Sequence, residues 1–146
     1  MTLKKAEIHP FEAFVPPKAR YLILGSFVSN ARDPSYDWYY SSKRNQFWPI
    51  IEKVYKTKLA DKKAKQNLFR KLNIAITDII VSCQRRDGNS KEDKIEKIYF
   101  TSRFVEKQFK KRFKTDITLV TLPSPSPRYA KLSFNEKVRR YRNLLL

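Results

Sequence analysis

The chain has 146 residues, of which 41% are hydrophobic and 14% aromatic, a composition typical of one folded domain and not of a disordered chain. Lysine and arginine number 32 against 14 acidic residues, and the formal net charge of +18 indicates a polyanionic partner, nucleic acid first. Two glycines exclude a glycine-rich phosphate loop, and one cysteine with one histidine excludes an internal disulfide and a zinc site.

The sequence also bears on location and organisation. A lone cysteine fits a reducing compartment, no apolar run is long enough to span a membrane, and the first residues lack the apolar segment of a signal peptide. We therefore expect a cytoplasmic monomer that binds no membrane, no metal and no other cofactor. No internal repeat is visible, so residues 1–146 are expected to form a single domain.

Strand-like and helical segments alternate along the chain after an irregular entry at residues 1–20. The apolar runs that predict strands are residues 21–24, 74–82, 97–101 and 117–122. Apolar residues have helical spacing in residues 45–56, in residues 59–72, in the segment that Ser102 caps and in the segment that Ser133 caps. This alternation predicts an α/β fold with a parallel sheet covered on both faces, whose ligands bind at the carboxyl ends of the strands.

The basic residues of the predicted helices are expected to face solvent. Lys62, Lys63 and Lys65 should lie opposite the apolar side of the second helix. Lys137 and Arg139 belong to a basic run in the last helix that we also interpret as a solvated face. Some of these charges could follow DNA phosphates at long range.

The most unusual loop is LPSPSPRY, residues 122–129, directly after the last predicted strand. Its prolines restrict the chain before any ligand binds, and Ser124 and Ser126 can bind phosphate oxygens. Arg128 could enter a groove of DNA or fill the gap left by an extruded base. A rigid connection between a strand and a helix explains the composition equally well.

A second candidate is YYSSKRNQFW, residues 39–48. Aromatic rings such as Tyr40 can stack on bases, Lys43 and Arg44 can meet phosphates, and the Asn45 amide can read a base edge or hold a water. The alternative is that Phe47 and Trp48 simply form core at the start of a helix. We accept that alternative for Trp48 and in part for Phe47, but it explains Tyr39, Tyr40 and Arg44 poorly.

Two further positions lie at predicted strand ends. Gly25, Ser26 and Phe27 follow the first strand, where a glycine lets a ligand approach the backbone and Phe27 could be a stacking platform; a plain turn is the simpler reading. Asp78 is a carboxylate inside an apolar strand, which needs either a partner or a task. A structural hydrogen bond is the commoner explanation, and the polar loop at residues 83–94 is by default solvated.

Taken together, these motifs resemble the uracil-DNA glycosylase superfamily, and more narrowly its hypoxanthine-DNA glycosylase-like branch. The resemblance covers nearly the whole chain and is carried, in order, by HPFEAFVPP, LILGSF, YYSSKRNQFW, DIIVSCQRRDGNS, KIYFTSRF and LPSPSPRY. It implies a three-layer α/β/α domain around a short parallel sheet of about four strands. It also implies metal-independent, monofunctional hydrolysis of the bond between deoxyribose and a deaminated base, uracil or hypoxanthine, flipped out of DNA.

The resemblance also implies roles for individual residues. The Asn or Asp that many superfamily members carry just after the first-strand glycine is missing here, so Asn45 becomes the catalytic candidate, with Asn30 as the alternative. The backbone N–H of Ser26 would stabilise the charge that develops on the leaving base. Phe27, Tyr40 and Gly25 would form the base pocket.

The DNA contacts implied by the resemblance come from two segments. Ser124 and Ser126 would grip the backbone while Arg128 replaces the departed base, and Arg44 and Lys43 would add phosphate contacts. The main alternative is a nucleic-acid-binding module that keeps the fold without catalysis. A metal-dependent nuclease is less favoured because the acidic residues are scattered along the sequence.

Overall fold

A computed structural model describes residues 13–25, 38–79 and 95–146. Within these ranges the strands are β1 (Tyr21–Gly25), β2 (Ile74–Asp78), β3 (Lys97–Phe100) and β4 (Thr118–Thr121). The helices are α2 (Phe47–Tyr55), α3 (Lys62–Leu72), α5 (Arg103–Arg112) and α6 (Phe134–Leu145). The elements follow one another in the order that the sequence predicts.

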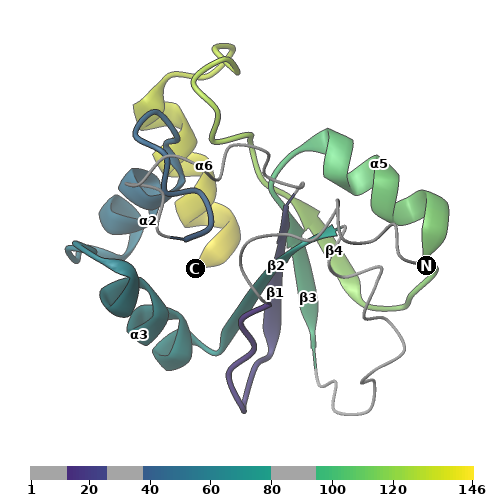
Figure 1. The fold of residues 1–146 in the computed structure, drawn as a ribbon. Helices are drawn as coiled ribbons and strands as arrows, with labels where there is room; N and C mark the ends of the chain where they lie inside the picture. Colours follow the sequence, from purple (N-terminus) through teal and green to yellow (C-terminus); the bar gives the residue numbers. More distant parts are fainter. Residues whose placement is uncertain (1–12, 26–37, 80–94) are drawn as a thin grey trace, which may run out of the picture.

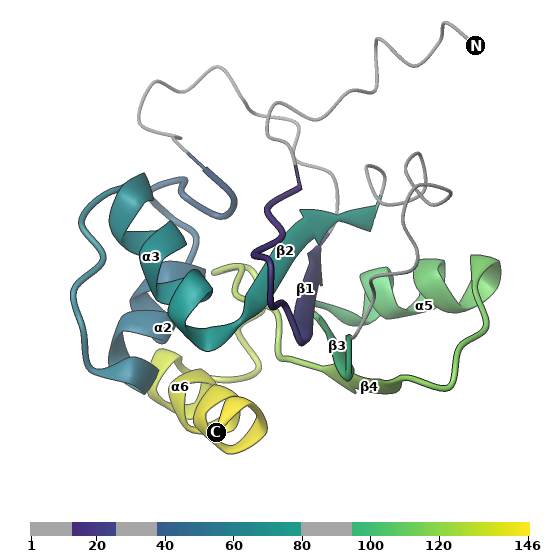
Figure 2. The same ribbon diagram turned by 90° about the horizontal axis from the view of Figure 1, so that it is seen from below.

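The four strands form one parallel sheet in the order β2-β1-β3-β4. Helices α2, α3 and α6 cover one face of the sheet and α5 covers the other, so the molecule has three layers (Figures 1 and 2). The predicted α/β fold with a short parallel sheet is therefore confirmed. Because every strand runs the same way, all four carboxyl ends lie along one edge.

Each face of the sheet has its own hydrophobic cluster. The larger cluster joins the sheet to α2, α3 and α6, and its fully buried members include Tyr39, Phe47, Phe69 and Tyr141. The smaller cluster, which includes Phe100, Val105 and Phe109, lies under α5. Strand β1 contributes Ile23 to the first cluster and Leu24 to the second, as alternation along a strand requires. This double burial explains the continuous apolar run of β1.

Local sequence signals set the helix boundaries. Ser102 and Ser133 cap α5 and α6 as predicted, their hydroxyls accepting the N–H groups of Val105 and Glu136. Asp61 caps α3 in the same way, so that helix begins at Lys62 and not at residue 59. Strand β2 ends at Asp78, earlier than the predicted residue 82, because Ile79 already has helical backbone conformation.

The expectation of solvated lysines is wrong at two positions. Lys65 and Lys137 are 8% and 1% exposed, respectively, whereas Lys62 and Lys63 are exposed. The physical reason is that both ammonium groups have partners beneath the helix surface, which compensates for their removal from water. None of the helices within the described ranges has the length and hydrophobicity needed to cross a lipid bilayer.

Candidate functional site

The carboxyl edge of the sheet is also the edge at which three of the helices in the described ranges begin. Helices α2, α5 and α6 each follow a strand of the sheet and start beside its carboxyl end (Figure 1). Their N-terminal N–H groups and dipoles make this edge favourable for anions such as phosphate. We call it the rim.

Side chains from separate segments meet at the rim around Gly25, the last residue of β1. Gly25 pairs with Asp78 of β2, and Asp78 is only 1% exposed. A Cβ atom on Gly25 would lie 1.8 Å from the Tyr40 hydroxyl oxygen and 3.1 Å from Oδ1 of Asp78. Any larger residue at position 25 would have to displace Tyr40, because the Tyr40 hydroxyl occupies the space of a side chain. A direct contact between Gly25 and a base stays a prediction.

Tyr40 is held in a strained but well-supported conformation. Its φ of 59° lies in the left-handed region, which costs a non-glycine residue about 1–2 kcal/mol. Its hydroxyl shares a 3.0 Å hydrogen bond with Oγ1 of Thr101, just past β3, and its ring stacks on Phe47 at 4.5 Å. Such strain is typical of functional sites, where surrounding contacts impose an unfavourable backbone. Tyr40 thus links β1, β3 and α2 at the rim.

The rest of the aromatic stretch belongs to the core. Trp48 is buried as predicted, and its indole N–H donates to the backbone oxygen of Tyr39. Tyr39 is completely buried, so our interpretation that it resists a core role is wrong. Its ring packs edge-on against Trp38, which stacks on Trp48. These contacts fix the backbone that carries Tyr40 and Asn45.

Asn45 lies at the N-terminus of α2, half-buried, on the rim. Its Oδ1 accepts the N–H of Phe47, the first residue of α2, at 2.8 Å. This bond fixes the amide orientation, because only the oxygen can accept it. The Asn45 NH₂ group is therefore better placed to donate to a ligand than the oxygen is to activate a water.

The loop after β4, residues 122–129, keeps both of its serines available as donors. We call it the serine loop. The Ser124 hydroxyl oxygen accepts the Ser126 N–H at 3.2 Å, and the Ser126 hydroxyl oxygen accepts the Arg128 N–H at 3.1 Å. Each hydroxyl still carries a hydrogen that can be donated to a phosphate oxygen. Arg128 itself is exposed.

Hydrogen bonds bring the serine loop and the stretch at residues 38–46 together. The Gln46 N–H donates to the backbone oxygen of Pro125 at 2.9 Å, next to Asn45. Tyr141 of α6 donates its hydroxyl to the backbone oxygen of Pro123 at 2.7 Å. Asn45 and Ser124, which are far apart in the sequence, therefore lie on one rim. Burial raises the pKa of Tyr141, so its hydroxyl stays protonated as a donor.

Lys137 of α6 is the central connection between these segments. Its ammonium group donates to Oε1 of Gln46 at 2.7 Å and to the backbone oxygen of Ser126 at 3.0 Å, and it lies 5.5 Å from the centre of the Tyr129 ring. Burial lowers the pKa of Lys137. A charged donor shared by two loops restricts both of them.

Lys65 of α3 plays a similar part beneath the aromatic stretch. Its ammonium group donates to the Ser41 hydroxyl at 3.0 Å and lies 5.3 Å from the centre of the Trp48 ring. The stretch at residues 38–46 is thus supported from below by a buried cation. Lys43 and Arg44, the predicted phosphate contacts, are exposed on this stretch.

Several predicted site residues lie outside the described ranges. These residues are Ser26, Phe27 and Asn30, and the polar loop at residues 83–94 is also outside them.

Sequence reasoning missed Lys137, Lys65 and Thr101, and it left Asp78 without a functional role. Helical spacing could have revealed the two lysines, since each shares its side of the helix with apolar residues. Among the described residues, no three His, Cys, Asp or Glu side chains lie together as metal ligands would.

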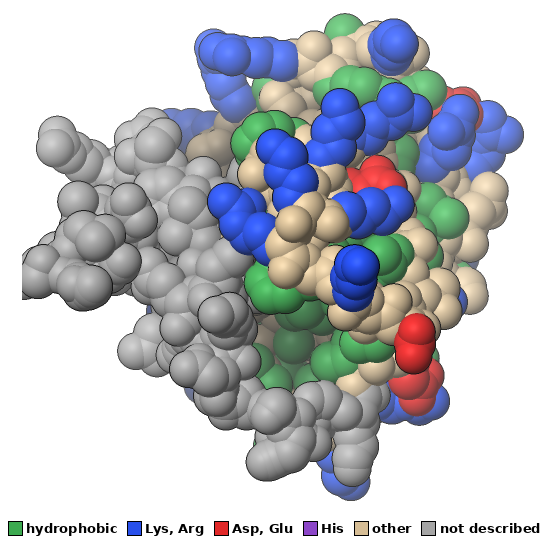
Figure 3. Space-filling model, turned by 90° about the vertical axis from the view of Figure 1, so that its right-hand side faces the viewer, with side chains coloured by type: hydrophobic (Ala, Val, Ile, Leu, Met, Phe, Trp, Pro, Cys, Tyr) green, Lys and Arg blue, Asp and Glu red, His purple; other side chains and the backbone are tan. Residues whose placement is uncertain are grey.

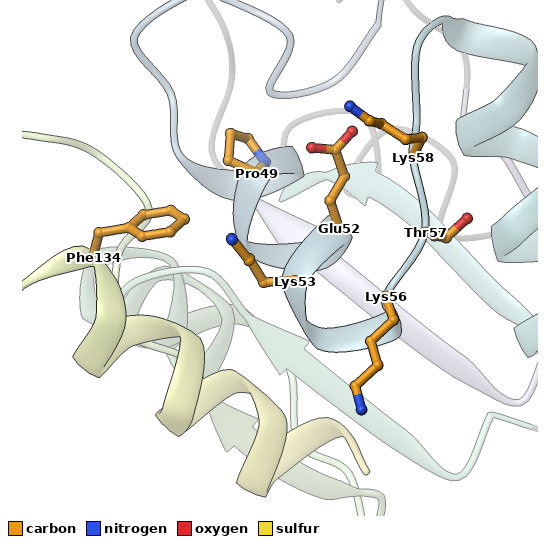
Figure 4. Close-up of a pocket in the computed structure, with 7 residues that line it drawn as sticks. All are labelled: Pro49, Glu52, Lys53, Lys56, Thr57, Lys58 and Phe134. Carbon is orange, nitrogen blue, oxygen red and sulfur yellow. The ribbon is translucent and has the colours of Figure 1, made fainter.

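Basic residues extend well beyond the rim. Lys and Arg side chains gather on the face that carries α5 (Figure 3). A groove of about 540 Å³ also runs along the outer side of α2, between the start of α6 and the segment that follows α2 (Figure 4). We call it the lysine groove; it is lined by Pro49, Glu52, Lys53, Lys56, Thr57, Lys58 and Phe134.

Comparison with known proteins bears on the fold. No family model matches the sequence, and no curated protein matches it. A solution NMR structure from Methanosarcina acetivorans, described as that of a candidate uracil DNA glycosylase, superposes with a TM-score of 0.62 at 19% sequence identity. The match covers 93% of this chain and 97% of the other. This chain therefore shares the fold of that protein over nearly its whole length.

Proposed function

We propose that the protein is a DNA glycosylase of the uracil-DNA glycosylase superfamily, acting on a deaminated base that has rotated out of the duplex. The observation that carries the proposal is the arrangement at the rim, where Tyr40, Asp78 and Thr101 surround the end of β1 beside Asn45 and the serine loop. The fold shared with the Methanosarcina protein and the charge of +18 are consistent with it.

Asp78 suggests how a deaminated base would be recognised. Deamination turns cytosine into uracil and adenine into hypoxanthine, and in both products a ring nitrogen that was an acceptor becomes an N–H donor. A carboxylate accepts a hydrogen bond from that N–H but is repelled by the lone pair of the undamaged base. Asp78, buried next to Tyr40, would thus distinguish uracil from cytosine and hypoxanthine from adenine, which agrees with the predicted substrate class.

The other residues would supply donors and positions. Asn45 would donate from its NH₂ group to a carbonyl of the base and so stabilise negative charge as the base leaves. The serine loop would hold the phosphates on either side of the target nucleotide, and Arg128 would fill the vacated position in the duplex. Stacking on Phe27 stays a prediction.

Monofunctional hydrolysis follows if no lysine attacks the sugar. Among the described residues, the buried lysines Lys65 and Lys137 donate hydrogen bonds to protein oxygens, which fits a supporting role better than a nucleophilic one. Borohydride treatment during the reaction is therefore expected to trap no covalent complex with DNA. A trapped complex that disappears in Lys137→Met would contradict the monofunctional mechanism.

The direct test uses duplexes that carry uracil, hypoxanthine or a mismatch. The protein is incubated with each duplex in the presence of a chelator, and the DNA is then treated with alkali. Strand breaks that appear only after alkali are expected. Breaks that need metal but no alkali would indicate a nuclease, and binding without any breaks would indicate a non-catalytic nucleic-acid-binding module.

Variants test the assigned residues. Asn45→Ala and Asp78→Ala should each lower the cleavage rate by about 100-fold or more, as removal of a hydrogen bond to the reacting group does. Asp78→Asn should retain part of the activity, because its amide oxygen can still accept the N–H of the base. Asp116→Asn, an exposed control, should leave cleavage unchanged. Retained binding of undamaged duplex would show that the inactive variants are folded.

A further inference from the structure

Outside the candidate site, the lysine groove combines a concave shape with three exposed lysines. We propose that it binds the sugar–phosphate backbone of DNA beyond the target nucleotide. The inference rests on the proposed DNA-binding function of the rim, which it extends along the outer side of α2. The rim would hold the target nucleotide, and the groove would hold the backbone beyond it.

The charge of the groove suits a phosphate chain. Lys53, Lys56 and Lys58 are all exposed, and Lys53 points into the space between α2 and Phe134 (Figure 4). The acidic residue among the lining side chains, Glu52, accepts the N–H of Leu59 at 2.8 Å. This bond turns the carboxylate toward the protein backbone, so the lysines dominate what a ligand meets. Phosphates bound by several lysines release counterions, which favours binding.

The apolar lining suits sugars and bases. Phe134 is half-buried, and Pro49 is exposed on the first turn of α2. Together they provide an apolar surface at the end of the groove nearest the rim. An aromatic ring beside a row of cations is the combination on which nucleic acid strands stack without sequence preference. An acidic patch on another protein would bind the lysines but would gain less from stacking on the Phe134 ring.

The groove is continuous with the rim. Pro49 follows closely after Gln46, whose N–H binds the serine loop, and Phe134 comes directly after Ser133, where that loop region gives way to α6. From there the groove follows α2, a helix of nine residues, to Lys56 and Lys58. A helix of this length spans about 13 Å, so a few nucleotides beyond the serine loop would reach its far end.

The test compares two triple variants. Lys53, Lys56 and Lys58 are replaced by Gln in the groove variant, and Lys107, Lys111 and Lys114 are replaced by Gln in the control, whose positions are exposed on or just after α5. Both variants lose the same charge, from opposite faces of the sheet. Affinity for an undamaged duplex is measured as salt is varied, so the result does not depend on catalysis.

The groove variant should bind at least about tenfold more weakly at low salt, and its plot of log affinity against log salt should be shallower by about 2 to 3. The control should change much less. For the groove variant, the loss should be largest on long duplexes and small on duplexes that end near the target nucleotide. Equal weakening in both variants, or no weakening in the groove variant, would overturn the proposal whether or not the protein cleaves DNA.

Discussion

The basic residues of helices α3 and α6 fall into two groups with opposite roles. Lys62 and Lys63 of α3 are exposed, whereas Lys65, on the same helix, is 8% exposed and binds Ser41. In α6, Arg139 pairs with Glu136 at the surface, whereas Lys137 is 1% exposed and binds two segments of the rim. A basic side chain is therefore solvated at one position of a helix and stabilises tertiary structure at another.

The difference shows how the rim is held together. The two segments that carry the candidate site, residues 38–46 and the serine loop, have little regular secondary structure of their own. A buried ammonium group supplies several donors at once to such segments, and each bond to a charged donor is stronger than a neutral one. The exposed lysines contribute to the positive field, which under the proposed function attracts DNA, but they do not position the site.

Replacement of Lys137 by Met should have the largest effect on stability. Methionine fills a similar volume but leaves Oε1 of Gln46 and the backbone oxygen of Ser126 without their donor. We expect the free energy of unfolding to fall by about 3 kcal/mol, measured by urea denaturation at neutral pH. Cleavage should also fall under conditions where the variant is folded. A loss as small as that of a surface substitution would contradict the role given to Lys137.

Replacement of Lys65 by Met should cost less. Lys65 donates to the neutral hydroxyl of Ser41, contacts the Trp48 ring and is 8% exposed, whereas Lys137 is 1% exposed and joins two segments of the rim. We expect a loss of about 1–2 kcal/mol in the same denaturation experiment. The order of the two variants is the informative result. If Lys65→Met lowered the free energy of unfolding more than Lys137→Met, Lys137 would not be the main connection between the segments of the rim.

The pH dependence of stability should show a smaller effect that is specific to Lys137. Burial lowers the pKa of Lys137 in the folded protein below the ordinary value of 10.5 that it has in the unfolded chain. Between these two pKa values, the unfolded chain therefore binds more protons than the folded one. Stability should therefore rise with pH in that interval for the unmodified protein relative to Lys137→Met. Buried tyrosines with raised pKa values act in the opposite direction at higher pH, but they cancel in this comparison.

Replacement of the exposed Lys62 by Met should have the smallest effect. The side chain lies on the solvent side of α3, at its first turn. We expect the free energy of unfolding to change by no more than about 0.5 kcal/mol. A change as large as that of Lys65→Met would mean that burial does not separate the two groups of lysines.

Much of this fold could be predicted from local patterns. Apolar runs located the strands, and Ser102 and Ser133 marked the helix starts, because these signals depend on residues close in the sequence. The burial of Lys65 and Lys137 depends on partners far along the chain. We expected both side chains to be solvated because they are lysines, although helical spacing places them beside apolar residues. The link between Gly25 and Tyr40 was likewise invisible, since it arises only when distant segments meet.

The most direct test of the central claim is a crystal structure of the Asn45→Ala variant bound to a duplex that contains uracil. The central claim is that the strand ends, residues 38–46 and the serine loop together enclose one nucleobase. The account predicts a uracil rotated out of the duplex, its ring beside Tyr40 and its N–H directed at Asp78, with the flanking phosphates at Ser124 and Ser126. A uracil that stays stacked in the duplex, or DNA bound on another face of the protein, would contradict it.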